Sequence, residues 1–245
     1  MSKFKVKRLT AHILMLKVIN DMLKYSFHLT LTQVKLLNLL VKSDDLKAKV
    51  PSIDCLLKLN EIESKIALFQ MLSYLNNHQW LSKQRDQRDQ RKLKIALNKN
   101  HMNKIEYMNN EVNDYIERYF AQYTLQTTSD YVNYLLRCKD LLERLKCYLN
   151  ICQLTLEELY VLGILYLHQG QLTVKELQVE FHHPIFSISP ILKNLIIKQL
   201  VQKERCELDE RRVIIIIKRE QFSKVTKLIH ACYNYLEKGI QDKEK

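Results

Sequence analysis

Apolar residues recur every three or four positions along most of the chain, which is the spacing of one face of an α-helix. This spacing predicts a first helix over about 9–27 and a corresponding helix over about 131–152. A second helix follows each, beginning at Thr30 and at Thr155. The glutamate three residues after Thr155 is typical of a capping box. Each half of the chain therefore starts with two long helices.

Two shorter helices come next in each half. Ser52 and Thr173 predict the start of a short third helix. The fourth helix covers about 63–77 in the first half. In the second half, Ser189 followed by Pro190 predicts an N-cap with proline at the first helical position.

After the fourth helix the period changes to short runs rich in β-branched and aromatic residues. Strands are predicted over 80–83, 92–97, 200–203 and 212–217, and each pair encloses a charged tip, so that each forms a hairpin. A long helix follows each hairpin. The order helix, helix, short helix, helix, hairpin, helix is that of a winged helix-turn-helix with flanking helices. The predicted fold is mainly α with small β-hairpin wings.

The two halves are also similar in sequence. LTLTQVKLLNLL over 29–40 matches LTLEELYVLGIL over 154–165 at five of twelve positions, and 80–97 matches 200–217 with an offset of 120 instead of 125. A repeat of this length indicates two homologous modules. We expect a first winged-helix module over 1–125, with its linker helix at about 100–125, and a second over 126–245.

Composition narrows the functional class. Only 3 of 245 residues are glycine, too few for a phosphate-cradling loop, and nothing resembles a nucleophile elbow, so we expect no enzyme and no cofactor. The six cysteines form no CxxC pair and are expected to be reduced, and His182-His183-Pro184 is expected to be surface rather than a metal site. No apolar run is long enough to cross a membrane, which predicts a soluble, cytoplasmic protein.

The formal net charge of +12 makes a polyanion the expected partner. Among polyanions, double-stranded DNA is the one that we expect first. Most of the surplus, +9, lies in residues 1–125. The first module should therefore dominate nonspecific affinity and its salt dependence.

In such modules the fourth helix enters the major groove and the wing follows the backbone or the minor groove. The predicted groove-facing residues are polar positions opposite the leucines that face the core. They are Lys65, Gln70 and Ser73 in the first module, and Ser187, Ser189, Lys193 and Asn194 in the second. The alternative for each is a solvated helix face.

The wings supply the predicted backbone and minor-groove contacts, because arginine favours the negative potential of narrow A·T-rich grooves. These residues are Lys83, Arg85, Arg88, Arg91 and Lys92 in the first module, and Lys203, Arg205, Arg211 and Arg212 in the second. Asp89 and Asp209 lie four residues after Arg85 and Arg205; either each orients its arginine or each simply forms the turn. Cys206 is an exposed-thiol candidate for oxidation, for which an inert thiol is the alternative.

The tandem arrangement and the wing sequence Arg205-x-x-x-Asp209-Glu210-Arg211, repeated as Arg85-x-x-x-Asp89-Gln90-Arg91, resemble the staphylococcal accessory regulator (SarA) family. This is a family of winged-helix transcription regulators related to the MarR type, and the likeness is to its two-domain members. It implies binding to A·T-rich promoter DNA, regulation of virulence genes, DNA contacts by the wing arginines, and support from Asp89, Asp209 and Glu210. Gln90 departs from the glutamate of the motif.

Single-domain members of that family look like homodimers, which implies that two fused modules supply both halves of a dimer. We therefore expect a monomer that acts as an intramolecular pseudo-dimer, with further self-association left open. The rival class is a protein-interaction module that modulates another regulator without its own DNA site. In that case the tyrosines of the linker helix, including Tyr107 and Tyr119, would bind the partner instead of packing.

Overall fold

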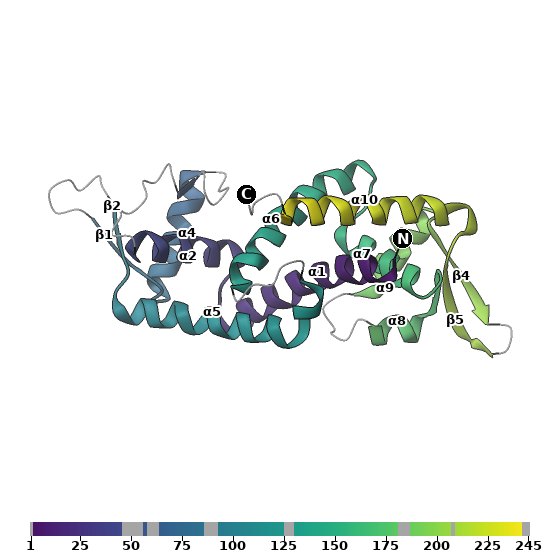
Figure 1. Ribbon diagram of the computed structural model, residues 1–245, viewed down its shortest axis with the longest axis horizontal. Helices are drawn as coiled ribbons and strands as arrows, with labels where there is room; N and C mark the ends of the chain where they lie inside the picture. The colour runs from purple at the N-terminus through teal and green to yellow at the C-terminus, as the bar shows by residue number, and fades with distance from the viewer. Residues whose placement is uncertain are drawn as a thin grey trace. The chain divides into compact units, whose positions relative to one another are not determined.

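The computed structural model describes residues 2–45, 56–57, 64–85, 93–124, 130–180, 187–206 and 209–241 (Figure 1). For 43–45, 85, 206 and 209–211 it describes the backbone alone. The chain divides into two compact units, one of residues 19–115 and one of residues 1–18 with 116–245. We call them the 19–115 unit and the 116–245 unit. The module boundary expected near residue 125 stays a prediction about the sequence repeat.

The 19–115 unit contains a helical scaffold and one hairpin. Its elements are the end of α1 (Lys3–Met22), the π-helical turn η1 (Leu23–Phe27), α2 (Leu31–Asp45), α4 (Lys65–Asn77), β1 (Ser82–Arg85), β2 (Leu93–Ala96) and most of α5 (Lys99–Phe120). β1 and β2 pair antiparallel from Ser82 opposite Ala96 to Arg85 opposite Leu93. The hairpin follows the fourth helix directly, as the sequence predicts.

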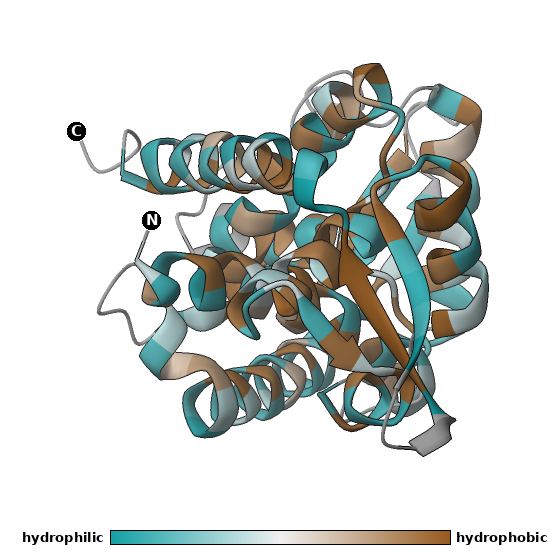
Figure 2. Ribbon diagram, turned by 90° about the vertical axis from the view of Figure 1, so that its right-hand side faces the viewer, coloured by the Kyte–Doolittle hydropathy of each residue, from teal (hydrophilic) through white to brown (hydrophobic). Residues whose placement is uncertain are grey.

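The 116–245 unit repeats this order with a larger sheet. After the 3-10 turn η2 (Ala121–Tyr123) come α6 (Tyr131–Ile151), α7 (Leu156–Leu167), β3 (Gln171–Thr173), α8 (Val174–Glu180), α9 (Ile188–Ile197), β4 (Val201–Cys206), β5 (Asp209–Ile217), η3 (Arg219–Gln221) and α10 (Phe222–Gln241). The strand order is β3-β5-β4, all antiparallel. Figure 2 shows the apolar residues of the hairpin concentrated on β5, against a more hydrophilic β4. The sequence analysis missed β3, because three residues show no period.

Equivalent junctions in the two units have the same backbone geometry. His28 and Gln153 end the first helix of each repeat in the left-handed region, with φ of 55° and 56°. Gln79 and Gln199 do the same after the fourth helix, with φ of 57° and 56°. The next residue then donates to a carbonyl five residues back, Trp80 to Leu75 and Leu200 to Leu195. The repeat in sequence is therefore also a repeat in local structure.

Three of the predicted N-caps are present in the structure. One predicted helix start and one predicted N-cap differ from it. The capping box at Thr155 and Glu158 is present, Thr173 and Glu176 exchange equivalent hydrogen bonds at α8, and Thr30 exchanges such bonds with Gln33. The first helix starts at Lys3 rather than near Leu9. The N-cap of α9 is Ser187, without a side-chain cap bond, so the prediction of an N-cap at Ser189 is wrong. Proline is tolerated throughout the first turn because the N–H groups there have no intrahelical partner, so Pro190 does not mark the first position.

The start of α1 is built into the core of the 116–245 unit. His12 Nδ1 donates to the Arg8 carbonyl and its Nε2 accepts from the Tyr134 hydroxyl, each at 2.5 Å. Arg8 also donates to the Thr124 carbonyl at 3.0 Å. A Cβ added at Gly163 would come within 2.5 Å of the Thr10 side chain, so glycine permits α7 to approach α1 closely. The first helix of one repeat thus packs against helices of the other.

Helix α7 is buried over most of its length, whereas α5 and α10 each have a buried side and an exposed side. None of the helices in the described part of the chain is long and apolar enough to cross a membrane.

Candidate nucleic-acid interface

Helix α4 has a buried side and an exposed side. Leu68, Leu72 and Leu75 are fully buried, as the sequence predicts for the core-facing leucines. Ser64 caps the helix by accepting a hydrogen bond from the Ala67 amide at 3.1 Å. The cap and the leucine stripe together fix which side of the helix faces solvent.

The exposed side of α4 carries both polar and apolar groups. Of the predicted groove residues, Lys65 and Gln70 are exposed. The sequence analysis missed two large apolar neighbours, Ile66 and Phe69, which are 70% and 39% exposed. Their signal was present in the sequence, since neither falls on the stripe of Leu68, Leu72 and Leu75 that helical spacing places toward the core. Exposed apolar side chains on this face suit contacts with thymine methyl groups.

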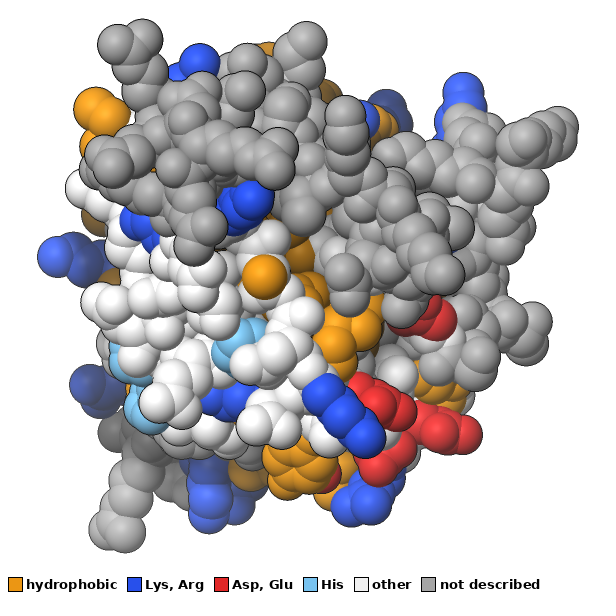
Figure 3. Space-filling model, turned by 90° about the vertical axis from the view of Figure 1, so that its left-hand side faces the viewer, with side chains coloured by type: hydrophobic (Ala, Val, Ile, Leu, Met, Phe, Trp, Pro, Cys, Tyr) orange, Lys and Arg blue, Asp and Glu red, His pale blue; other side chains and the backbone are white. Residues whose placement is uncertain are grey.

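Lys83 connects the first wing to α4. Its backbone amide donates to Asn76 Oδ1 at 2.9 Å, and its ammonium donates to the Ser73 hydroxyl at 2.6 Å. Ser73 itself donates to the Phe69 carbonyl at 2.8 Å. The structure therefore brings two predicted contact residues together, Ser73 from the helix and Lys83 from the wing. Figure 3 is the view from the side of β1 and β2, and it shows basic side chains at several places on the described surface.

Helix α9 presents the corresponding surface in the 116–245 unit. Ile188, Leu192 and Leu195 are buried against the core. The four predicted groove residues are all exposed: Ser187, Ser189, Lys193 and Asn194. Ile197, at the end of the same face, is 68% exposed.

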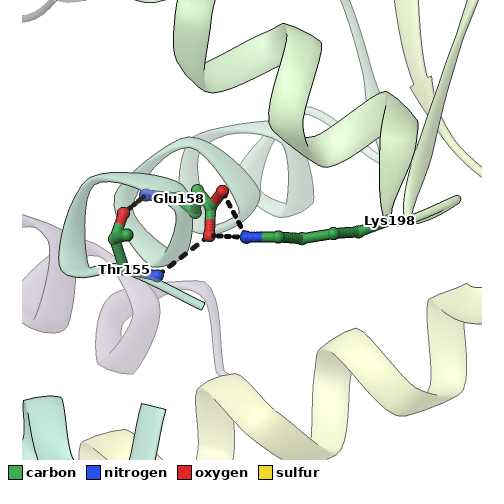
Figure 4. Close-up of polar contacts among 3 residues, drawn as sticks. All are labelled: Thr155, Glu158 and Lys198. Atoms are coloured by element: carbon green, nitrogen blue, oxygen red, sulfur yellow. Dashed lines mark hydrogen bonds and ion pairs between the residues drawn. The ribbon is translucent and has the colours of Figure 1, made fainter. Parts of the chain in front are cut away.

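An ion pair between a half-buried lysine and a buried carboxylate lies at the end of α9. Lys198, the C-cap residue of α9, places its ammonium 2.6 Å from both carboxylate oxygens of Glu158 (Figure 4). Glu158 is 1% exposed and also accepts from the Thr155 amide at 2.9 Å, as part of the capping box that starts α7. The carboxylate thus joins the start of α7 to the end of α9. A buried charge needs such a partner because desolvation is costly.

The second wing carries exposed basic residues on both strands. Lys203 and Arg205 on β4 and Arg212 on β5 are exposed. Arg205 stands opposite Val213, and the register shifts before Cys206, which stands opposite Asp209. Gln202 donates to Glu204 at 2.5 Å, so one acid of this wing is engaged within β4.

Several predicted wing residues lie outside the described part of the chain. Arg88, Asp89, Arg91 and Lys92 belong to an undescribed segment, and only the backbone is described for Arg85, Cys206, Asp209, Glu210 and Arg211. Their roles, including the orientation of arginines by Asp89 and Asp209, stay predictions.

Comparison with known proteins decides the family. The family model for the transcriptional regulator SarA/Rot matches residues 18–108 and 145–228, once in each repeat. The chain belongs to the SarA/Rot family of transcriptional regulators. This match confirms the family resemblance that was inferred from the wing motif. It also confirms the predicted fold class of tandem winged-helix modules.

The crystal structure of AbsC, a MarR family transcriptional regulator from Streptomyces coelicolor, is similar over 48% of this chain and 82% of that chain, with 17% identity and a TM-score of 0.40. No curated protein sequence matches the chain. As a SarA/Rot family member, the protein is a DNA-binding transcription regulator, and its partner is double-stranded DNA.

Proposed function

We propose that this regulator recognises A·T-rich promoter DNA of virulence-type genes with two recognition helices and two wings on a single chain. The observation that carries the A·T preference is the exposed face of α4, where Ile66 and Phe69 lie beside Gln70. Apolar side chains contact the thymine methyl group, and glutamine pairs with adenine, so this face complements A·T base pairs.

The packing of α1 supports action as a monomeric pseudo-dimer. Helix α1 of the first repeat is held in the core of the 116–245 unit through His12 and Tyr134, and the Lys5 ammonium lies 5.3 Å from the centre of the Tyr233 ring. In a homodimer the same kind of helix pairing would join two chains. Here one chain supplies both helices, and a monomer binding one duplex is the expected species.

The proposal is tested by fluorescence anisotropy with duplexes of about 25 base pairs, one A·T-rich and one G·C-rich, across a salt series. A third duplex replaces thymine by deoxyuridine, which removes the methyl group and preserves base pairing. We expect A·T-preferring binding that weakens about threefold to tenfold on the deoxyuridine duplex. Phe69→Ala should lose this sensitivity, whereas Asn77→Ala, at the exposed end of the same helix, should retain it.

Arg91→Ala and Arg211→Ala test the two wings in the same assay, and each is expected to weaken binding and lower the salt slope by about one unit. Sedimentation of the complex should give one chain per duplex. Equal affinity for A·T-rich and G·C-rich duplexes, with no effect of either arginine, would refute the proposal.

A further inference from the structure

The 116–245 unit contains a groove that the DNA-binding surface does not use. It has a volume of about 820 Å³ and lies between the end of α6, α7 and the start of α10. Its floor is apolar, formed in part by the buried side chains of Leu154, Leu200 and Val225. None of its lining residues belongs to α9. DNA at α9 and a second ligand in the groove therefore occupy different surfaces.

The edge of the groove is positively charged and apolar. Lys224 and Lys227 lie at the edge, with Glu220 as the acid among the lining residues. Ile151 and Tyr148, also lining residues, are 82% and 43% exposed. Exposed apolar groups that extend a groove are characteristic of a protein-binding surface.

Equivalent positions in the 19–115 unit can be identified from the shared junctions. Phe27 comes directly before the left-handed residue His28, as Cys152 comes before Gln153. Trp80 comes directly after Gln79, as Leu200 comes after Gln199. The offset of 120 that relates the hairpins continues into the next helix, where buried Ile105 corresponds to buried Val225. It relates Lys104 to Lys224 and Tyr107 to Lys227.

In the 19–115 unit these positions are occupied by an aromatic cluster. The ring of Phe27 lies 6.4 Å from that of Trp80 and 6.1 Å from that of Tyr107, in edge-to-face geometry. The Lys104 ammonium lies 4.1 Å from the centre of the Trp80 ring, a cation–π contact. Trp80 is 1% exposed, so the cluster fills its site with side chains of the chain itself.

The second repeat has a lysine at the position of Lys104 but no aromatic residue at the three positions of the cluster. Where the first has Phe27, Trp80 and Tyr107, the second has Cys152, Leu200 and Lys227, and the groove lies at this place. Lys224 occupies the position from which Lys104 contacts an aromatic ring. The first repeat thus indicates what fits there, namely an aromatic ring beneath a lysine. The added Lys227 favours a ligand with negative charge near that ring.

We propose that this groove binds an aromatic side chain carried by an acidic segment of a partner protein. The ring occupies the place that Trp80 and Phe27 take in the other repeat, and acidic residues beside it face Lys224 and Lys227. Ile151 and Tyr148 extend the contact beyond the groove, which favours a polypeptide over a free aromatic acid. An aromatic anchor in a pocket surrounded by weaker contacts is the usual form of an interaction hot spot.

The test is a random-peptide display selection on the full-length protein, with counter-selection on a variant whose groove is filled. Leu200→Trp combined with Cys152→Phe restores two aromatic residues of the first repeat. Ser223→Trp covers the exposed edge without changing the core. We expect selected peptides to share an aromatic residue flanked by aspartate or glutamate.

Synthetic versions of the selected peptides are then titrated by fluorescence anisotropy. Replacing the aromatic residue by alanine should weaken binding at least tenfold. Both groove-filling variants should weaken it tenfold or more, and Lys224→Gln with Lys227→Gln about fivefold to tenfold. Lys238→Gln, an exposed lysine farther along α10, is the matched control and should bind as the wild type does.

Three results would overturn the inference. One is the absence of any enrichment for aromatic and acidic residues. Another is equal binding by the wild type and by a Ser223→Trp variant whose far-UV circular dichroism is unchanged. The third is saturable binding of free indole-3-acetate at the groove with no peptide binding, which would make the site one for small aromatic acids. DNA affinity should stay unchanged in the Lys224→Gln variant, so failure here is distinguishable from failure of the proposed A·T recognition.

Discussion

The two repeats hold their fourth helices, α4 and α9, in different ways although the adjoining junctions have the same backbone geometry. In the 116–245 unit, Lys198 at the end of α9 pairs with the buried carboxylate of Glu158. In the 19–115 unit the equivalent positions are His78 and Gln33, so a lysine–carboxylate pair cannot form there. There Tyr74 on α4 donates to the His28 carbonyl at 2.6 Å, a neutral bond to the end of the first helix.

This difference shows that the fold does not require the ion pair. Gln33 accepts from the Thr30 amide at 2.7 Å, so a neutral side chain performs the same capping function as Glu158. The ion pair is an addition specific to the second repeat. The end of α9 therefore depends on the charges of both Lys198 and Glu158, because a buried charge without its partner is strongly unfavourable. The end of α4 has no such dependence.

The largest expected effect comes from removing one partner of the ion pair. Lys198→Met leaves the Glu158 carboxylate buried without its cation and should lower the free energy of unfolding by about 3 kcal/mol or more. Adding Glu158→Gln, the residue found at the equivalent position 33, should restore most of that loss. Urea titrations of the wild type, both single variants and the double variant form the required cycle.

His78→Ala is the matched substitution at the equivalent position of the first repeat. It should cost less than Lys198→Met, because it leaves no buried charge. A double variant no more stable than Lys198→Met would contradict the view that the unpaired carboxylate is the cause.

A second effect follows from His12, whose burial lowers its pKa to about 4 from an ordinary value of 6.5. The folded state therefore binds this proton less readily than the unfolded state. The stability from neutral His12 is complete above pH 6.5 and is lost progressively as the pH falls from 6.5 toward 4, by roughly 3 kcal/mol in all. The loss belongs to the 116–245 unit, where His12 contacts Tyr134.

Unfolding free energies at several pH values check this prediction. The variant His12→Gln, which does not titrate, should lose less stability over the same interval. His230→Gln, at an exposed position on α10, should follow the wild type. Because the single tryptophan, Trp80, lies in the 19–115 unit, its fluorescence should respond less to acid than the circular dichroism of the whole chain. Parallel pH profiles for the wild type and His12→Gln would rule out His12 as the source.

The periodic and capped parts of the fold could be predicted from the sequence, and side-chain pairing across helices could not. The stripe of Leu68, Leu72 and Leu75 fixes the buried side of α4 because period 3.6 alone determines which residues share a face. The capping box at Thr155 is a local pattern. The contact between Glu158 and Lys198 joins residues 40 apart, and nothing in their spacing indicates it.

In the candidate site, too, the sequence predicts which residues are exposed but not which side chains contact one another. The exposure of Gln70, Lys193 and Asn194 follows from helix periodicity, whereas the hydrogen bond of Lys83 to Ser73 depends on how the hairpin leaves α4. The groove was missed for a further reason. It lies where the second repeat has smaller or aliphatic residues, such as Leu200 in place of Trp80, and such a replacement leaves no periodic pattern in the sequence.

The smallest effect should be equal in the two repeats, since it depends on geometry that they share. Gln79 and Gln199 have φ of 57° and 56°, where a side chain costs about 1–2 kcal/mol relative to right-handed backbone. Glycine removes this strain but loses more entropy on folding, about 0.5–1 kcal/mol. Gln79→Gly and Gln199→Gly should therefore each raise the unfolding free energy by about 0.5–1 kcal/mol in urea titrations. A clear gain at one position alone would mean that the two junctions, despite equal backbone angles, are strained by different surroundings, and that the repeats differ in more than the ion pair.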